Sequence, residues 1–220
     1  MATKPTNGYE QNLSRETDVE YNTLGVMLRT LRCRLFGTTD VSRWRDAEAF
    51  PDDWAGRTQL IAQLVPKGTR VIEFGAGKRK LESQIDPTCT YIPCDIVSRG
   101  KDTLVLDLNA RPLPNLRHLN LDMAVFAGVI EYIADLGSFV TWLSRQASTC
   151  IASYECAQTQ SWGSPARLRE TIRRTGAGWV NTFSEHELIE IFRSGGFALT
   201  ETKDWRTPDG TERIFVFLKL

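Results

Sequence analysis

The sequence has no cysteine pattern of the kind that holds zinc or a disulfide framework. Its five cysteines are an odd number, and no two of them are spaced as Cys-x-x-Cys. This argues against a zinc ribbon and a dense disulfide network, so we expect no metal site. Scattered reduced thiols are typical of a cytoplasmic protein, which is the localisation that we expect.

Long hydrophobic runs and a charge imbalance are also missing. No apolar run approaches the ~20 residues of a membrane helix. Residues 1–8 lack the apolar core of a secretory signal. Lysine and arginine total 27, as do aspartate and glutamate, so the formal net charge is zero. We therefore expect a soluble chain whose surface does not follow nucleic acid.

What is present suits a single α/β domain with a helical extension. The chain has 220 residues, of which 41% are hydrophobic. Residues 1–53 predict an N-terminal helical extension and cap, and residues 54–220 the main domain. Within the extension, Leu24, Leu28 and Leu31 recur at helical spacing. We expect this basic, apolar helix to pack over a cleft, although the pattern also suits a membrane surface.

Buried strands alternate with helices through the middle of the chain. Such alternation is typical of an α/β fold with a largely parallel sheet and helices on both faces. The expected strands are residues 69–74, 90–95, 103–108, 123–127 and 149–154. We expect one helix that begins at residue 51, a short helix over residues 81–85 and a third helix that includes residues 139–143.

The end of the chain predicts a different arrangement. Ser184 and Glu187 form a capping-box pattern that opens a helix running to Ser194. Two apolar runs, residues 197–205 and 212–220, follow as a hairpin. The last run is apolar on both faces, so we expect it inside the sheet. The whole pattern predicts a doubly wound, mostly parallel, Rossmann-like seven-stranded sheet with a C-terminal antiparallel hairpin.

An irregular insertion is expected at residues 157–178. Its arginines suit bidentate binding of a phosphate or carboxylate, which would make the bound partner anionic. A solvated basic helix explains the same residues equally well. The side chains concerned are Trp162, Arg167, Arg169, Arg173 and Arg174.

Two glycines and two acids predict a ligand site at one edge of the sheet. Gly75 and Gly77 follow a buried strand and allow a ligand to approach the main chain closely. Asp95 ends the next strand about twenty residues later, where an acid can bind ribose hydroxyls, and Asp107 ends the third. Open α/β sheets bind their ligands at these carboxyl ends.

With these motifs, the chain resembles the class I S-adenosylmethionine-dependent methyltransferases over roughly residues 54–220. The run Val-Ile-Glu-Phe-Gly-Ala-Gly looks like the first motif of that family. The similar segments are residues 71–77, 91–95, 106–109, 121–133, 183–188 and 195–197. One departure is Arg79, which stands where the family often has a third glycine.

The resemblance implies S-adenosylmethionine as the cofactor. By that resemblance, the glycine backbone and Glu73 face its methionine part, Asp95 binds the ribose and Asp107 holds adenine. Phe126, Ala127 and Gly128 border the sulfonium. The implied cofactor residues are Glu73, Gly75, Ala76, Gly77, Asp95, Ile96, Asp107, Leu108, Phe126, Ala127 and Gly128.

Candidate catalytic residues lie after the fourth and fifth strands and at the start of the late helix. We select Glu131, Tyr154 and His186, because strand ends and the first turn of that helix face the expected cleft. His118 lies in a polar stretch and is expected at the surface.

The function that these residues predict is methyl transfer to a small-molecule acceptor or to an acceptor of saccharide or lipid type. Proximity and orientation would drive the reaction, with or without a general base. One alternative is a catalytically inactive module that binds S-adenosylmethionine and a partner. A NAD(P)-dependent oxidoreductase is a further alternative, but the third phosphate-loop glycine is missing and Asp107 has no role there.

Overall fold

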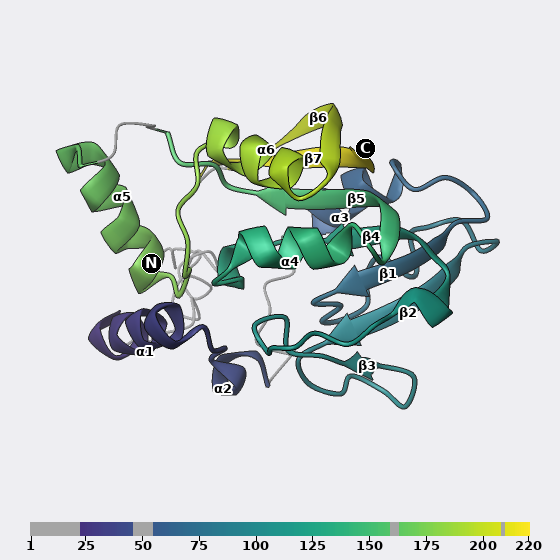
Figure 1. Cartoon of the computed structure of the whole chain (residues 1–220), viewed down its shortest axis with the longest axis horizontal. Helices are drawn as coiled ribbons and strands as arrows, with labels where there is room; N and C mark the ends of the chain where they lie inside the picture. The colour runs from purple at the N-terminus through teal and green to yellow at the C-terminus, as the bar shows by residue number, and fades with distance from the viewer. Residues whose placement is uncertain (1–22, 46–54, 159–162, 208–209) are drawn as a thin grey trace, which may run out of the picture.

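The computed structural model describes residues 23–45, 55–158, 163–207 and 210–220. Within these ranges one sheet has the strand order β3-β2-β1-β4-β5-β7-β6 (Figure 1). The first five strands are parallel, and β7 lies antiparallel between β5 and β6. The strands are β1 (Arg70–Phe74), β2 (Thr90–Asp95), β3 (Leu104–Val105), β4 (Leu121–Phe126), β5 (Ala147–Tyr154), β6 (Phe197–Thr207) and β7 (Gly210–Lys219).

Helices cover both faces of this sheet. In Figure 1, α4 and α6 lie on one face and α3 on the other, while α1, α2 and α5 lie beyond the carboxyl ends of the parallel strands. The helices are α1 (Thr23–Phe36), α2 (Val41–Trp44), α3 (Ala55–Ala62), α4 (Leu136–Leu143), α5 (Pro165–Gly176) and α6 (Glu185–Ser194), with short 3₁₀ turns η1 (Arg117–Leu119) and η2 (Ile130–Tyr132).

Alternation along the strands divides the core into two layers. In β4, Ala124 and Phe126 face the layer under α4 and α6, whereas Met123 and Val125 face the layer under α3. Successive side chains of a strand point to opposite faces, so strands covered on both sides are apolar throughout. The predicted α/β class, the mostly parallel seven-stranded sheet, its C-terminal antiparallel hairpin and the inner position of the last strand are all confirmed.

Two local predictions in this region are wrong. The third strand is only two residues long, because the backbone N–H of Asn109 donates to Asp107 Oδ1 (2.9 Å) and turns the chain. Residues 81–85 form turns instead of a helix. Pro87 disfavours a helical conformation at Asp86, directly after this segment, so the chain cannot continue into a second helical turn.

The insertion at residues 157–178 is more regular than expected, because it contains α5. Ser164 begins this helix, and its side chain accepts a hydrogen bond from the Arg167 backbone N–H. Pro165 occupies the first turn, where its missing N–H costs nothing. The expected helix start at residue 51 and the side chain of Trp162 lie outside the described residues.

The leucine stripe of α1 faces solvent, so the prediction that it packs over the cleft is wrong. The buried residues of α1 are Val26, Thr30 and Cys33, on the opposite side of the helix. Only this narrow side of the helix is buried, because α1 packs against α5 and does not lie across the sheet.

The capping box of α6 is confirmed. Ser184 Oγ accepts from the Glu187 backbone N–H (3.3 Å), and Glu187 Oε2 accepts from the Ser184 backbone N–H (2.7 Å). Two orphan donors of the helix start are thereby satisfied.

Replacing Ser184 with alanine is expected to lower the free energy of unfolding by about 1 kcal/mol. The reason is that a buried helix start loses the acceptor for one of its N–H groups. Urea denaturation measures the change, and Ser194→Ala, at the exposed end of the same helix, is the matched control. Equal midpoints for the two variants would contradict a stabilising cap.

Candidate cofactor site

A cavity opens where the carboxyl ends of β1, β2 and β4 meet the loop before α2, the end of α2 and the first turn of α3. It holds about 1070 Å³ free of protein atoms, part of it open to solvent. Ligands bind in such a crevice at the carboxyl ends of the strands of an open α/β sheet. Its lining includes Glu73, Gly75, Ala76, Gly77, Asp95, Ile96, Asp107, Leu108, Ala127 and Gly128.

The sequence therefore located every predicted cofactor residue at this cavity except Phe126. The Phe126 ring is fully buried and stacks on Phe74 with 4.9 Å between centroids. Strand alternation explains the error: Phe126 points into the core layer under α4, and Ala127 is the first residue after β4 to reach the cavity.

The glycine turn is tightly built. Gly75 has a φ of 71°, a region that favours glycine, and a Cβ at this position would lie 2.5 Å from Val129 Cγ2. The backbone N–H of Ala76 donates to the Cys94 carbonyl (3.0 Å), and that of Gly77 to Asp95 Oδ2 (2.9 Å). The turn thus joins β1 to the end of β2 and leaves its inner side open to a ligand.

Arg79 preserves the shape of this turn although it replaces a glycine. Its φ is 57°, in the left-handed region. The guanidinium donates to Glu82 (2.9 Å) and Asp102 (2.8 Å), and these bonds offset a strain of about 1–2 kcal/mol. The arginine points to acids on the surface, while Lys78 and Lys80 line the cavity.

Arg99 is a pocket residue that sequence reasoning missed. Asp95 is buried, and its Oδ2 accepts from Arg99 Nε at 3.2 Å. The same guanidinium donates to the Trp44 carbonyl and to the Arg45 carbonyl (3.0 Å). Arg99 thus ties the end of β2 to the segment around α2. No motif signals this, because Trp44 and Arg99 are far apart in the sequence.

Asp107 and Asn109 shape the side of the cavity that lies after β3. Thr39 Oγ1 donates to Asp107 Oδ1 at 2.6 Å, so the loop after α1 closes over the end of β3. Asn109 Nδ2 donates to the Tyr132 carbonyl (2.8 Å), and its Oδ1 accepts from the Ala134 N–H (2.8 Å). Thr39, Asn109 and Tyr132 all line the cavity and were not predicted.

Two buried ionisable side chains, Glu73 and Arg57, lie at the base of the cavity. Burial raises the pKa of Glu73 to about 8, although the Tyr91 hydroxyl, which donates to its carboxyl, opposes that rise. Arg57 donates from Nη1 to Glu212 (3.0 Å) and from Nη2 to the Ala127 carbonyl (3.2 Å). At neutral pH Glu73 is therefore largely protonated and accepts a hydrogen bond without carrying a full charge.

The three predicted catalytic residues do not meet at this cavity. Glu131 is buried behind the wall, and burial together with the charge of Glu212 raises its pKa to about 8. The Tyr154 hydroxyl donates to Asn181 Oδ1 and accepts from the Phe183 N–H, both at 2.8 Å, which is a structural arrangement. His186 lies on α6, away from the cavity lining.

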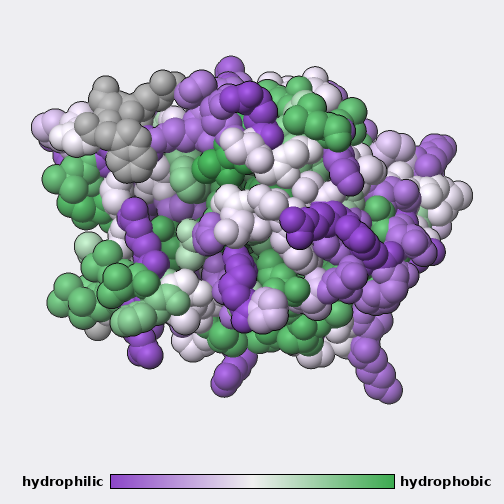
Figure 2. Space-filling model, viewed as in Figure 1, coloured by the Kyte–Doolittle hydropathy of each residue, from purple (hydrophilic) through white to green (hydrophobic). Residues whose placement is uncertain are grey.

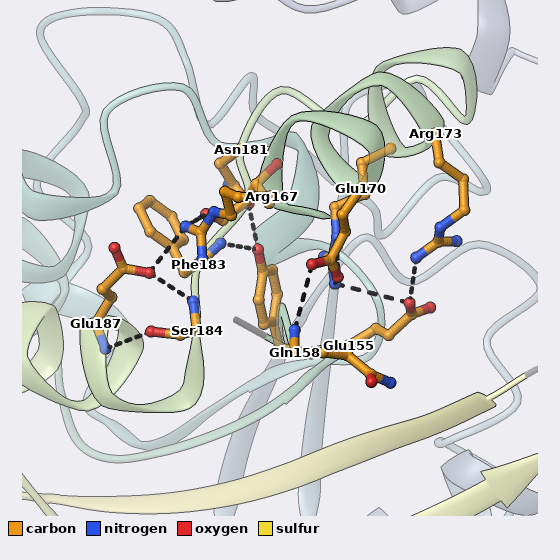
Figure 3. A network of polar contacts seen from close by, with 12 residues as sticks. Glu155, Gln158, Arg167, Glu170, Arg173, Asn181, Phe183, Ser184 and Glu187 are labelled. Carbon is orange, nitrogen blue, oxygen red and sulfur yellow. Dashed lines mark hydrogen bonds and ion pairs between the residues drawn. The ribbon is translucent and has the colours of Figure 1, made fainter. Parts of the chain in front are cut away.

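The arginines of α5 are divided between the interior and the surface. Figure 3 shows Arg167 directed toward Glu187 and Arg173 directed toward Glu155. Arg167 is buried and donates to Glu187 (2.9 Å), and the fully buried Arg174 donates to Glu170 (3.0 Å). A wholly solvated basic helix is therefore wrong. Arg169 is exposed to solvent.

Within the residues that the structure describes, histidine, cysteine and acidic side chains do not gather into a group that would hold a metal ion. In the same ranges no helix combines the length and apolar character needed to cross a membrane.

No family model matches this sequence, and no curated protein matches it significantly. Solved structures do match its fold. Human N-acetylserotonin methyltransferase, in complex with S-adenosylmethionine, is 15% identical with a TM-score of 0.60, over 92% of this chain and 68% of that one. The 1,6-didemethyltoxoflavin-N1-methyltransferase of Burkholderia thailandensis, with its substrate and S-adenosylhomocysteine bound, is 14% identical with a TM-score of 0.58, over 87% and 88%.

A third match is the magnesium protoporphyrin IX methyltransferase of Synechocystis, with bound S-adenosylhomocysteine. It is 14% identical with a TM-score of 0.52, over 87% of this chain and 99% of that one. At such identities the shared property is the architecture. The chain therefore has the Rossmann-like fold of the class I S-adenosylmethionine-dependent methyltransferases.

Proposed function

We propose that this chain binds S-adenosylmethionine in the cavity and transfers its methyl group to a small-molecule acceptor. The observation that carries the proposal is the convergence of the glycine turn with Asp95, Asp107 and Ala127 on one cavity, from four separate strand ends. Solved structures of the same fold that hold this cofactor or its demethylated product support it.

The residues present fit that cofactor. A Cβ at Gly75 would lie 2.5 Å from Val129 Cγ2, so the turn that lines the cavity keeps its shape only with glycine at this position. Asp95 and Asp107 offer carboxylates for hydroxyl and amine donors, and Leu106 and Leu108 offer an apolar wall for a flat ring. Glu73 would accept from the amino group of the methionine part.

The cofactor, when bound, supplies an activated methyl group on a sulfonium. The protein is then required to hold the acceptor atom in line and to exclude water, which can supply ~7–11 kcal/mol of the barrier. In the described part of the chain, the N-terminal segment supplies this cover through Thr39 and Trp44. The acceptor class, of saccharide or lipid type, belongs to the same proposal.

Titration calorimetry tests the cofactor. S-adenosylhomocysteine and S-adenosylmethionine are expected to bind with a stoichiometry of one, and NADH is expected not to bind. The reason is that two acids and a two-glycine turn line the cavity, without the third glycine of a pyrophosphate loop. Tight binding of NADH without either adenosyl compound would replace the proposal with the oxidoreductase alternative.

A binding module without transferase activity is the second candidate. It is favoured by one observation: Glu131, Tyr154 and His186 all lie outside the cavity lining. Incubation with methyl-labelled cofactor and fractionated cell extract separates the two. Labelling of a low-mass compound supports transfer, whereas cofactor binding with unlabelled fractions throughout supports the module.

A further inference from the structure

The helix α1 presents an unpartnered apolar stripe. Leu24, Leu28, Leu31 and Leu35 follow one another at spacings of four, three and four residues, which places them on one side of a helix. All four are between 49% and 77% exposed. An exposed leucine forgoes the favourable free energy of transfer out of water, so a continuous stripe of this kind indicates a partner.

The stripe continues onto α5. Leu168 and Ile172, one turn apart, are 61% and 49% exposed, and α5 packs directly against α1. Figure 2 shows one group of hydrophobic side chains over α1 and a smaller group over α5 at this end of the molecule. We call these six side chains, with the arginines beside them, the α1–α5 face.

Among the described residues, the exposed charged side chains of α1 and α5 are all arginines. The sequence of α1 contains no acidic residue, and Arg32 and Arg34 are exposed on opposite flanks of its leucine stripe. On α5, Arg169 is exposed, whereas the acid Glu170 turns inward to Arg174. An apolar stripe bordered by arginines on both sides is complementary to a surface that is apolar within and anionic outside.

Two further exposed arginines on these helices carry bound acids. Arg29 pairs with Asp40 (2.9 Å), and Arg173 pairs with Glu155 (2.5 Å). Each lies about 100° or more around its helix from the nearest apolar side chain of the face, so the border consists of Arg32, Arg34 and Arg169.

A second copy of the chain is a poor match for this face. In a helix pair joined through the four leucines, Arg32 and Arg34 would occupy the flanking positions that set pairing by charge. Two copies would bring arginine against arginine there, and like charges are destabilising. An acidic, apolar surface avoids that repulsion.

We propose that the α1–α5 face binds the surface of a membrane that contains anionic lipid, with the leucines in the headgroup boundary and the arginines on lipid phosphates. The loop after α1 contributes Thr39 to the cavity, so attachment would hold the cavity next to the lipid surface. This inference goes beyond the proposed function and does not depend on it, because vesicle binding is measured without cofactor.

Flotation of the full chain with lipid vesicles tests the proposal. Binding is expected to vesicles with about 30 mol% phosphatidylglycerol and to be at least about tenfold weaker with phosphatidylcholine alone. Sodium chloride at about 0.5 M is expected to weaken it, because screening acts on the arginine–phosphate attraction. Leu28→Gln with Leu31→Gln should lower binding at least about tenfold, since both side chains lose apolar burial.

The matched control is Leu218→Gln with Leu220→Gln, two exposed apolar residues near the C-terminus. Both pairs lie on the surface, so circular dichroism is expected to show folded variants. Unchanged vesicle binding in the α1 variant would overturn the proposal. An absence of vesicle binding by the unmodified chain would also overturn it. If the unmodified chain instead forms a concentration-dependent dimer or binds an acidic protein, and the α1 variant loses that association, the face has a protein partner and the proposal is likewise overturned.

Discussion

Alanine at Gly75 is expected to weaken S-adenosylhomocysteine binding at least about 100-fold. The added Cβ would lie 2.5 Å from Val129 Cγ2, on a β-branched side chain that has little freedom to move. The turn must then shift, and the backbone N–H of Gly77 moves away from Asp95 with it. Calorimetric titration of the variant measures the loss.

Gly68→Ala separates this effect from general backbone strain. Gly68 has nearly the same φ (72°) as Gly75 (71°), but a Cβ there meets no atom within 4 Å. Each variant is expected to lose about 1–2 kcal/mol of stability, because alanine is strained in the left-handed region. Only Gly75→Ala should lose the ligand. Similar affinities in both variants would show that the ligand does not approach this turn.

Stability is expected to fall as the pH rises from about 5 to 8. The pKa of Glu73 is raised from 4.5 to about 8 in the folded protein, mainly by burial, and that of Glu131 is raised in the same direction. In this window the folded state keeps a proton that the unfolded state has lost. Each such proton lowers the free energy of unfolding by ~1.4 kcal/mol per pH unit.

The sign is opposite for the carboxyls with lowered pKa. Hydrogen bonds from Ser42 and Arg29 outweigh burial and lower the pKa of Asp40, and a hydrogen bond from Ser138 lowers that of Asp135. Their contributions are lost as the pH falls below the ordinary range of aspartate. Between pH 5 and 8 these aspartates stay ionised in both states, so the pH dependence of stability that we expect there comes from Glu73 and Glu131.

Glu73→Gln tests this dependence. Glutamine keeps an acceptor for the Tyr91 hydroxyl but cannot ionise, so the slope of stability against pH should decrease by about one proton. Urea denaturation at several pH values measures the slope, and Glu201→Gln, on an exposed strand position, is the control. Parallel curves for Glu73→Gln and the unmodified chain would mean that Glu73 is already ionised near pH 5.

Much of the cofactor cavity was predictable because its parts are local. A buried run such as residues 70–74 followed by Gly75 and Gly77 specifies a strand and a turn within a few residues. Asp95 and Asp107 follow strands in the same way, and parallel strands bring their carboxyl ends to one edge. Their roles toward a ligand stay predictions, which the binding experiments address.

The residues that the sequence did not reveal are those whose position depends on distant partners. Arg99 reaches the carbonyls of Trp44 and Arg45, and Thr39 reaches Asp107, across more than fifty residues of chain. Tyr154 ends a strand as the candidate catalytic residues were expected to do, yet Asn181 and Phe183 engage its hydroxyl. Strand ends specify an edge, but packing decides which side chains reach the cavity.

The sequence by itself determined the α/β class, the glycine turn, the acids after β2 and β3, and the capping box of α6. These features depend on the periodicity of apolar residues and on backbone N–H groups whose hydrogen-bond partners are close in the sequence. Only the tertiary structure decided that Phe126 lies in the core and that α5 replaces an irregular insertion. It also decided which side of α1 is buried, because helical periodicity marks an apolar stripe but does not say what will cover it.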